Sequence, residues 1–187
     1  MENWKPYGPW KIKSTATAYK DAFVDVRLDQ VIRPDQKDGQ HVVVEMKPGV
    51  CVLAMDQEDG ETFVYLTDEF HYGIGQHSIE AVSGGIELGE DPDETARREL
   101  EEELGLVAES WEYLFSVNPF TTIIVSPTRV YFAKGLTRVD TNLEGTEQIE
   151  MVRMPLREAI ADVRAGKITH TPTCIAIYEA ALRIATE

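Results

Sequence analysis

Short runs of apolar, β-branched and aromatic residues alternate with turn-forming residues from Trp10 to Phe70. The runs lie at residues 23–32, 41–46, 50–55 and 62–66. Their length and composition are typical of strands. Turn sequences such as Pro48-Gly49 and Asp59-Gly60 separate them, as in hairpin or turn connections. This half of the chain is therefore predicted to be a set of antiparallel strands.

A helical pattern replaces the strand pattern at Asp91. Asp91 is a suitable N-cap, Pro92 suits the first helical position, and Glu94 completes a capping box three residues after the cap. Gly105 ends this helix. The pattern then predicts strands at residues 111–117 and 129–133, a strand or a loop at 121–125, and a helix at 155–165. Thr171-Pro172 is predicted to cap and open a final helix that runs to about Ile184. Strands with segregated helices predict an α/β (α+β) sandwich of sheet and helix layers around one core.

The composition narrows the kinds of partner. The chain of 187 residues carries 33 acidic and 18 basic residues, a formal net charge of −15, so it has no broad cationic face for a nucleic acid or an anionic membrane. Cys51 and Cys174 are far apart in sequence and are expected to be reduced core residues. No apolar stretch suits a signal peptide or a membrane span. A cytoplasmic protein is expected, with no nucleic acid or membrane partner.

The helix that begins near Asp91 carries a concentration of acids. Glu99 and Glu103 are four residues apart and share one face, and Glu102 lies beside them. The buried stripe of the same helix is formed by Ala96, Leu100 and Leu104. Like charges at this spacing repel one another, and a hard divalent cation bound by carboxylate oxygens would remove that repulsion. Mg²⁺ fits best, because it uses few carboxylates and takes further oxygens from phosphate and water; a solvated acidic face is the simpler alternative.

The spacing of residues around this helix decides between these alternatives. Gly84 is followed after five residues by Glu90 and after seven more by Arg98-Glu99-Leu100, and the series ends with Glu102-Glu103 and Gly105-Leu106. This series resembles the Nudix box at every fixed position. The resemblance implies a Nudix-type sheet-and-helix sandwich. It also implies hydrolysis of the diphosphate of a nucleoside diphosphate linked to another group, with Mg²⁺, or Mn²⁺ in its place.

The resemblance also implies roles within the box. Glu99 and Glu103 correspond to metal ligands, and Glu102 to a variable ligand or a general base. Arg98 corresponds to the residue that pairs with a carboxylate to hold its rotamer, and Glu90 to one that supports the loop. The carbonyl of Ser83 is implied as a further metal ligand. Gly84 and Gly85 are implied as close backbone contacts of the substrate, and Gly105 closes the helix.

Beyond the box, from Trp10 to Ile184, the chain resembles the ADP-ribose pyrophosphatase group of the family. Members of that group have an N-terminal antiparallel sheet, often exchanged across a homodimer, and the strands of residues 10–44 occupy the corresponding place. The implied organisation is an N-terminal dimerisation element of antiparallel strands at residues 1–45, followed by a Nudix hydrolase domain at residues 46–187. A homodimer is expected, because it would bury the unpaired strand edges of such an element.

Substrate contacts are implied by residues on either side of the box. The aromatic, glycine-containing segment at residues 69–75, which leads to Glu80, is similar to one in this group. It makes Glu80 and His71 candidate substrate-binding residues, and Arg129 is a further one. His71 stands where the group usually has an arginine, and Val82-Ser83 where it usually has proline and alanine. These departures concern the residues that would select the substrate.

An acidic loop at residues 144–150 resembles the loop that supplies a general base or an extra metal ligand in this group. Glu147 is its closest positional match, and an exposed acidic turn is the alternative for that residue. A carboxylate on a mobile loop can reach a site only when substrate is bound. Glu147 and Glu102 are therefore both candidates for the group that accepts a proton from water.

These resemblances together imply Mg²⁺-dependent hydrolysis of a nucleoside diphosphate sugar, first of all ADP-ribose to AMP and ribose 5-phosphate. Another sugar nucleotide, such as GDP-mannose, or a dinucleotide is the alternative within the same chemistry. His71 replaces the group's usual arginine, and neither Asn118-Pro119-Phe120 nor Ser126-Pro127-Thr128 matches the Ser-Pro-Gly signature that normally follows the box in this group. A regulator that binds a nucleotide sugar without cutting it is the alternative from another class. Every carboxylate of the box is present, which favours the enzyme.

Overall fold

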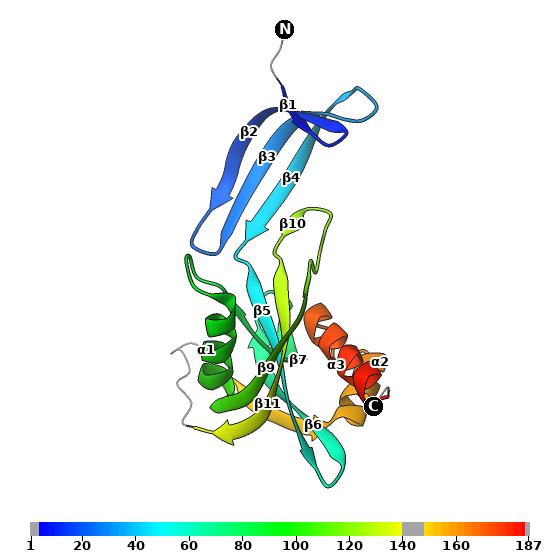
Figure 1. Ribbon diagram of the computed structural model, residues 1–187. Coiled ribbons are helices and arrows are strands. Elements are labelled where there is room, and N and C mark those ends of the chain that lie inside the picture. The colour runs from blue at the N-terminus through cyan, green and yellow to red at the C-terminus, as the bar shows by residue number, and fades with distance from the viewer. Residues whose placement is uncertain (1–3, 140–147, 186–187) are drawn as a thin grey trace. The chain divides into compact units, whose positions relative to one another are not determined.

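The computed structural model describes residues 4–139 and 148–185 of the chain. The chain divides into two compact units (Figure 1). The first consists of Met1–Lys47 and Asn118–Pro127, and the second of Pro48–Val117 and Thr128–Glu187. The segment 118–127, which the sequence placed in the second domain, therefore belongs with the N-terminal strands.

The first unit contains one sheet with the strand order β1-β2-β3-β4-β10. Its strands are β1 (Lys5–Tyr7), β2 (Trp10–Lys20), β3 (Val24–Ile32), β4 (Asp38–Met46) and β10 (Ile124–Val125). The strands from β1 to β4 pair antiparallel, as predicted, whereas β10 pairs parallel to β4. The backbone N–H of Val44 also donates to the carbonyl of Ile123, with an N···O distance of 2.7 Å. Of the segment 121–125, only its last two residues form a strand.

The second unit contains a sheet with the path β12-β6-β5-β11-β9, in which β7 also pairs with β6 and β8 with β5. Its strands are β5 (Gly49–Glu58), β6 (Glu61–His71), β7 (Gln76–Glu80), β8 (Val82–Gly85), β9 (Leu106–Val117), β11 (Thr128–Arg138) and β12 (Glu150–Pro155). β5 lies at the centre, parallel to β11 and antiparallel to β6 and β8. The sheet is therefore mixed, and β8 leads directly from it into the box.

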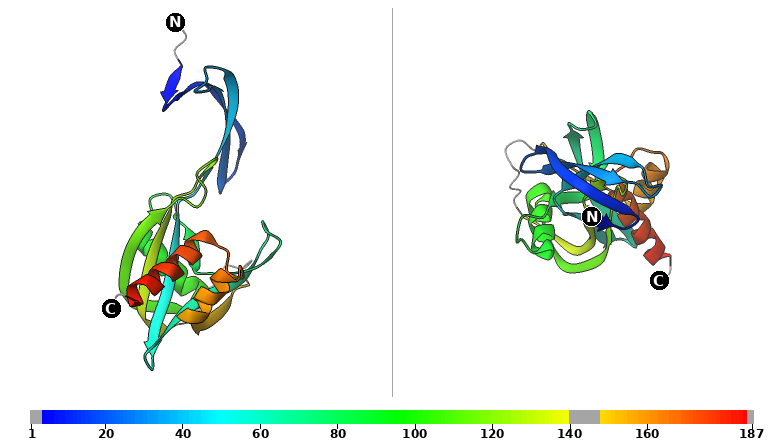
Figure 2. Two further views of the ribbon diagram at one scale, coloured as in Figure 1. Left: turned by 90° about the vertical axis from the view of Figure 1, so that its right-hand side faces the viewer. Right: turned by 90° about the horizontal axis from the view of Figure 1, so that it is seen from above.

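Helices cover both faces of this sheet (Figures 1 and 2). α1 (Pro92–Leu104) packs on one face, and α2 (Leu156–Arg164) and α3 (Thr171–Ile184) pack on the other. Side chains of β5 alternate between the two layers: Val50 and Val52 pack with Leu100 of α1, and Cys51 and Leu53 pack with Ile177 of α3. Because successive side chains of a strand point to opposite faces of the sheet, β5 contributes to two hydrophobic cores, one on each face. The predicted sandwich of sheet and helix layers is confirmed.

The N-cap and the end of α1 lie at the predicted residues. The Asp91 side chain accepts a hydrogen bond from the backbone N–H of Asp93 at 2.8 Å, and Gly105 ends the helix with a φ of 58°. A left-handed residue at this position is typical of glycine. None of the helices within the described ranges is long and apolar enough to cross a membrane.

The N-terminus of α3 differs from the prediction. The N-cap is His170 and not Thr171, which is already helical. The reason lies in the backbone, because the N–H of Cys174 donates to the carbonyl of His170 at 2.9 Å, so the first helical hydrogen bond begins at the histidine. This difference places His170 at a junction between α3 and the sheet.

Candidate active site

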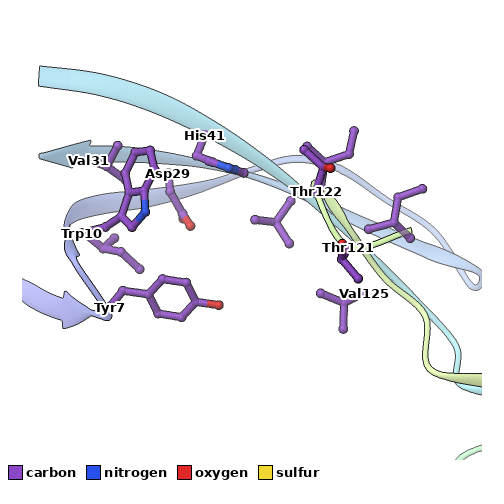
Figure 3. A pocket seen from close by; sticks show the side chains of 12 residues that line it. Tyr7, Trp10, Asp29, Val31, His41, Thr121, Thr122 and Val125 are labelled. Carbon is purple, nitrogen blue, oxygen red and sulfur yellow. The ribbon is translucent and has the colours of Figure 1, made fainter. Parts of the chain in front are cut away.

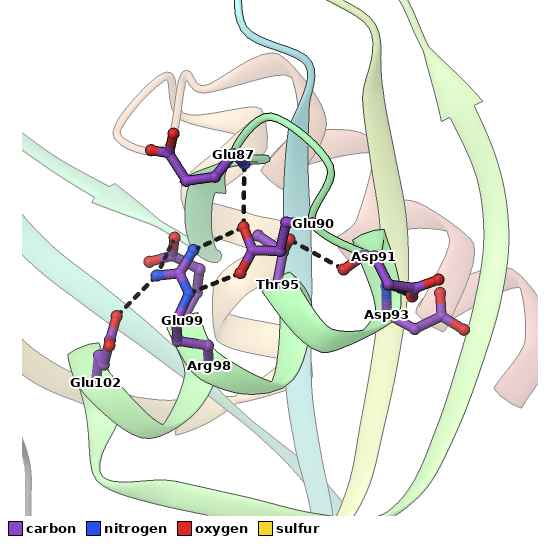
Figure 4. Close-up of polar contacts among 8 residues, drawn as sticks. All are labelled: Glu87, Glu90, Asp91, Asp93, Thr95, Arg98, Glu99 and Glu102. Atoms are coloured by element: carbon purple, nitrogen blue, oxygen red, sulfur yellow. Dashed lines mark hydrogen bonds and ion pairs between the residues drawn. The ribbon is translucent and has the colours of Figure 1, made fainter.

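Arg98, in the middle of α1, lies at the centre of a cluster of carboxylates (Figure 4). Its Nε is 3.0 Å from Glu90 Oε1, and its Nη1 is 2.8 Å from Glu102 Oε2 and 2.9 Å from Glu99 Oε1. One carboxylate comes from the loop before the helix and two from the helix itself. The planar guanidinium can hold all three because its donors point in fixed directions. The predicted pairing of Arg98 with a carboxylate thus involves three glutamates.

Glu90 closes the loop that connects β8 to α1. The backbone N–H of Glu87 donates to Glu90 Oε2 at 3.0 Å, and the N–H of Glu90 donates to the carbonyl of Glu87, also at 3.0 Å. The hydrogen bonds from Arg98 and, to a smaller extent, from the N–H of Glu87 together lower the pKa of Glu90 to about 2. Glu90 is therefore ionised at neutral pH and ties the loop to the helix, at the place where a loop support was predicted.

Glu99 extends from α1 over the backbone of β8. A Cβ atom built on Gly84 would lie 2.0 Å from Glu99 Oε1 and 2.5 Å from its Cγ, so only glycine leaves room for this side chain. The Glu99 side chain is 13% exposed, and Gly84 itself pairs with Val50 of β5. The carboxylate is therefore held between the helix and the sheet, with its oxygens beside a bare stretch of backbone.

Glu103 and Glu80 both lie close enough to act on the buried thiol of Cys51. Burial raises the pKa of Cys51 to about 12, with smaller contributions from the negative charges of Glu80 and Glu103. Cys51 pairs with Ser83 in the β5–β8 ladder, and the Ser83 hydroxyl donates to the carbonyl of Ala81 at 2.8 Å. Ser83 therefore lies directly opposite Cys51 in the sheet. Cys51 is a free thiol, as expected, and so is Cys174.

The donor set at this place suits a hard divalent cation. Glu99 and Glu103 offer carboxylate oxygens, and the strand that leads into Gly84 offers carbonyl oxygens, among them that of Ser83. Within the described ranges no three histidine, cysteine, aspartate or glutamate side chains converge closely enough to enclose an ion by themselves. Mg²⁺ does not require such a cage, because it keeps waters and is completed by substrate phosphates. The oxygen ligands beside Gly84 thus suit a cation that keeps some of its waters and gains phosphate oxygens when the substrate binds.

Glu80 lies between two histidines. His71 Nε2 is 3.4 Å from Glu80 Oε1, and His170 Nδ1 is 3.0 Å from Glu80 Oε2. His71 and Glu80 were both selected from the sequence, but His170 was not. It is 90 residues from Glu80 in the chain, and no local pattern pairs them. Its position beside the Thr171-Pro172 helix start was the one available signal.

Arg129 is held by aromatic residues on the β9–β11 side of the sheet. Its guanidinium carbon is 5.4 Å from the centre of the Tyr113 ring. It also forms a hydrogen bond with Tyr131, which raises the pKa of Arg129. The Tyr131 hydroxyl donates to Asp93 Oδ1 at 2.7 Å. These contacts join Arg129 to the start of α1, and they differ from those of the Arg98 cluster.

Two other predicted residues complete the account of the second unit. Gly85 is the last residue of β8 and pairs with Gly49, so it stands where the strand enters the box loop. Glu147 lies outside the described residues. The structure thus brings Glu80, Ser83, Gly84, Glu99 and Glu103 together around β8, with Arg98, Glu90 and Glu102 beside them.

A separate hollow of about 190 Å³ lies in the first unit (Figure 3). Tyr7, Trp10 and His41 line it, together with residues 121–125. The Trp10 and His41 rings meet edge to face with their centres 5.7 Å apart. Asp29, also in the lining, is 4% exposed and accepts a hydrogen bond from the Thr15 hydroxyl at 2.6 Å. None of the site residues predicted from the sequence lies in this hollow.

Comparison with protein families shows that residues 45–174 match the NUDIX domain. The chain therefore belongs to the Nudix family. Enzymes of this family use divalent metal ions and act on small molecules derived from nucleotides. Within the family, the expected resemblance to the ADP-ribose pyrophosphatase group is confirmed. The prediction that the chain is a pyrophosphohydrolase is also confirmed.

Three similar proteins illustrate this placement. The ADP-ribose pyrophosphatase of Mycobacterium tuberculosis is 31% identical over 161 residues, which cover 84% of this chain and 76% of that protein. The methanol dehydrogenase activator of Bacillus methanolicus is 27% identical over 169 residues, 89% of this chain and 90% of that protein. A crystal structure of an ADP compounds hydrolase superposes with a TM-score of 0.78 at 19% identity and covers 97% of each chain. The last comparison confirms the Nudix-type fold.

Proposed function

We propose that the protein hydrolyses the diphosphate of a nucleoside diphosphate sugar, with ADP-ribose as its first substrate and AMP and ribose 5-phosphate as products. The observation that carries the proposal is the position of Glu99, whose carboxylate lies against the bare backbone of Gly84 while Arg98 fixes its other side. This arrangement places carboxylate oxygens beside the backbone of β8, where we place the diphosphate. The similarity to the mycobacterial ADP-ribose pyrophosphatase supports the choice of substrate.

Mg²⁺, with Mn²⁺ as its replacement, is the proposed cofactor, and Glu99, Glu103 and the carbonyl of Ser83 are its proposed ligands. When bound, the cation neutralises the charge of the diphosphate and polarises its phosphoryl oxygens. The carboxylates have the hard oxygens that Mg²⁺ prefers. Glu102 is a further ligand if it leaves Arg98, with which it is paired at 2.8 Å.

The other residues of the cluster hold the reacting groups in place. Arg98 fixes the rotamers of Glu99 and Glu102 through its ion pairs, and Glu90 fixes the loop that leads into the helix. Gly84 leaves room for the Glu99 side chain, and the backbone of Gly84 and Gly85 is the proposed contact of the diphosphate. A water molecule attacks one phosphorus atom, the bond from that phosphorus to the bridging oxygen breaks, and a carboxylate takes the proton of the water. Glu147 and Glu102 are the two candidates for that carboxylate.

A different nucleotide substrate is the second candidate within the same chemistry. His71 contacts Glu80 at the place where the group usually has an arginine, so the residues that select the sugar differ from the group's pattern. GDP-mannose and dinucleotides are the alternatives. The name of the Bacillus methanolicus relative describes an activator of another enzyme. For this reason, a regulator that binds a nucleotide sugar without cutting it is the alternative function from another class.

A homodimer is proposed through the first unit. β2 pairs with β1 only over Trp10–Ile12, so the rest of β2, at residues 13–20, has β3 on one side and no strand on the other among the described residues. Tyr19 at the end of this edge and Phe23 beyond it are 57% and 69% exposed. An open edge next to exposed aromatic residues is typically covered by another chain.

A substrate panel tests the proposed function. Purified protein is incubated with ADP-ribose, GDP-mannose, a dinucleotide and a nucleoside triphosphate, each with Mg²⁺ and each with chelator, and products are identified by ³¹P NMR. Mg²⁺-dependent release of AMP and ribose 5-phosphate, faster than turnover of any other compound, supports the proposal. A higher kcat/KM for GDP-mannose or a dinucleotide would show that this compound, and not ADP-ribose, is the substrate. Binding without turnover of any compound would show that the protein is a regulator and not an enzyme.

A further inference from the structure

The carboxylate of Glu80 lies between two imidazole rings at the end of β7, and its side chain is 13% exposed. His71 Nε2 faces one carboxylate oxygen and His170 Nδ1 the other. A carboxylate only accepts hydrogen bonds, and a nitrogen lone pair facing it at 3.0 Å would be repelled. The hydrogen of each ring therefore sits on the nitrogen that faces Glu80. His170 is the nearer of the two partners.

His170 is fixed by the first turn of α3. Its Nδ1 is also 2.9 Å from the hydroxyl oxygen of Thr173, which is completely buried. The same hydroxyl oxygen accepts the backbone N–H of Ala81 at 2.8 Å. The start of α3 thus holds two consecutive residues of the sheet, Glu80 through the imidazole and Ala81 through Thr173. The carboxylate has little freedom to turn, because its support comes from a helix and not from a loop.

The group formed by Glu80, His71 and His170 is rich in hydrogen-bond acceptors. Burial lowers the pKa of His170, and His71 also lowers it, whereas the Glu80 carboxylate raises it. The His170 ring is therefore neutral at neutral pH, and its outer nitrogen, Nε2, is an acceptor. No lysine or arginine of the described ranges forms an ion pair with Glu80. A phosphate would be repelled here, whereas hydroxyl groups would find the acceptors they need.

This acceptor group adjoins the proposed diphosphate site. The carbonyl of Ala81, the residue after Glu80, accepts a hydrogen bond from the Ser83 hydroxyl at 2.8 Å, and Ser83 directly precedes Gly84 in β8. A sugar attached to a diphosphate at Gly84 would therefore extend towards Glu80. The inference rests on the proposed function, since it needs a substrate that carries both groups.

We propose that Glu80 binds the hydroxyl groups of the sugar next to the diphosphate, and that His170 is a positioning residue that holds Glu80 in the orientation this requires. The ligand class is a sugar with free hydroxyls, on either side of the diphosphate. Thr173 supports the same arrangement through Ala81. The role of His170 is to donate one hydrogen bond from Nδ1, and a side chain that can do the same should replace it.

Three substitutions of His170 separate positioning from packing. In His170→Asn the amide nitrogen lies near the place of Nδ1, whereas in His170→Gln it lies near the place of Nε2, and His170→Ala removes both. Loss of a hydrogen bond to a charged group should lower kcat/KM by about tenfold or more, mainly through KM. We expect this loss in His170→Ala and His170→Gln, and a value within about threefold of wild type in His170→Asn.

His77→Ala is the matched control. His77 pairs with Asp68 at 2.8 Å on the same two strands and is 67% exposed, so it is a histidine–carboxylate pair without a part in the site. Its kcat/KM should stay at the wild-type value. Thermal unfolding of all four variants shows whether any loss reflects instability. Equal kcat/KM in the three His170 variants, with wild-type KM, overturns the positioning role.

Deoxy analogues test the hydroxyl-binding role. Wild type and Glu80→Gln are compared on ADP-ribose, on an analogue without a hydroxyl on the terminal ribose and on one without the 2′-hydroxyl of the adenosine. Wild type should prefer ADP-ribose over one of the analogues by about tenfold, and Glu80→Gln should lose that preference. The analogue affected identifies the sugar. An unchanged preference in Glu80→Gln overturns the proposal.

The outcome is distinguishable from failure of the proposed function. If wild type turns over another sugar nucleotide faster than ADP-ribose, the same variants are assayed with that compound and with its deoxy analogue. If wild type turns over none, calorimetric titration of the variants with ADP-ribose measures binding in place of KM. In each case the wild-type result tests the proposed function. The differences among the Asn, Gln and Ala variants at position 170 test the positioning role of His170.

Discussion

The Glu99 carboxylate occupies the space in which the side chain of any residue other than glycine at position 84 would begin, with Oε1 2.0 Å from the place of a Cβ atom. The obstacle is the far end of a flexible side chain and not the backbone. An alanine can therefore be accommodated if Glu99 turns away. A glycine at position 84 is therefore needed to position the Glu99 carboxylate, but it is much less important for the stability of the fold.

Gly84→Ala should accordingly leave the protein folded and inactive. We expect a Tm within a few degrees of wild type, and a kcat lowered by about tenfold or more because Glu99 is displaced. Gly73→Ala is the control, since a Cβ there meets no atom within 4 Å. Steady-state kinetics and thermal unfolding measure the two effects. A Gly84→Ala enzyme with wild-type kcat contradicts the role given to the Glu99 position.

Glu99→Gln and Glu103→Gln should each lower kcat by about two orders of magnitude or more, because an amide binds Mg²⁺ poorly while keeping the size of the side chain. The wild-type protein should gain Tm on addition of Mg²⁺, because ligand binding favours the native state, and both variants should lose most of that gain. Glu101→Gln, an exposed acid on the same helix, should behave as wild type. Normal turnover in both variants would remove the metal assignment.

The two candidate bases can be separated by kinetics. If Glu147 accepts the proton of the attacking water, Glu147→Gln should lower kcat by about 100-fold or more with little change in KM. Glu102→Gln should then have a mild effect, with loss of one ion pair to Arg98. The reverse pattern assigns the proton to Glu102. Mild effects in both variants would leave no dedicated protein base.

The Glu90–Arg98 pair should appear in the pH dependence of stability. The pKa of Glu90 falls from the ordinary value of 4.5 to about 2 in the folded protein, so its contribution is present above pH 4.5 and is lost as the pH falls through 2. The difference in Tm between wild type and Glu90→Gln should therefore be largest above pH 4.5 and should close towards pH 2. A difference that stays constant over this range contradicts the assignment.

The oligomeric state tests the proposed use of the first unit. Light scattering should give the mass of a dimer at micromolar concentration, and the double substitution Tyr19→Lys with Phe23→Glu should shift it towards the monomer, because it places charges among exposed aromatic residues. Tyr178→Lys, at another exposed apolar position on α3, should leave the mass unchanged. A wild-type monomer under these conditions would refute the dimer.

Local signals in the sequence predicted those parts of the structure that depend on neighbouring residues. α1 begins after Asp91 and ends before Gly105 as predicted, because capping involves groups only a few residues apart. The predicted buried stripe of Ala96, Leu100 and Leu104 is also confirmed, since it follows from the helical period. The motif around them identified the family for the same reason.

Contacts between distant segments were not predictable in this way. The pairing of Glu80 with His170 joins residues from different elements, and neither residue type indicates the other. The parallel pairing of β10 with β4 rests on two residues, too few to form a recognisable pattern. His170 as the N-cap of α3 followed from the backbone and not from its side chain, which makes no capping hydrogen bond.

The discontinuous first unit limits how the protein can be dissected. Since residues 118–127 complete the sheet begun by residues 4–47, the polypeptide passes from one unit to the other three times, and no single cut yields either unit whole. A shortened protein that starts at Pro48 would retain Ile123 and Ile124 without the strand that pairs with them. An expression design for the catalytic unit alone must therefore also replace residues 118–127 with a short linker between Val117 and Thr128, which pair directly with each other in the β9–β11 hairpin.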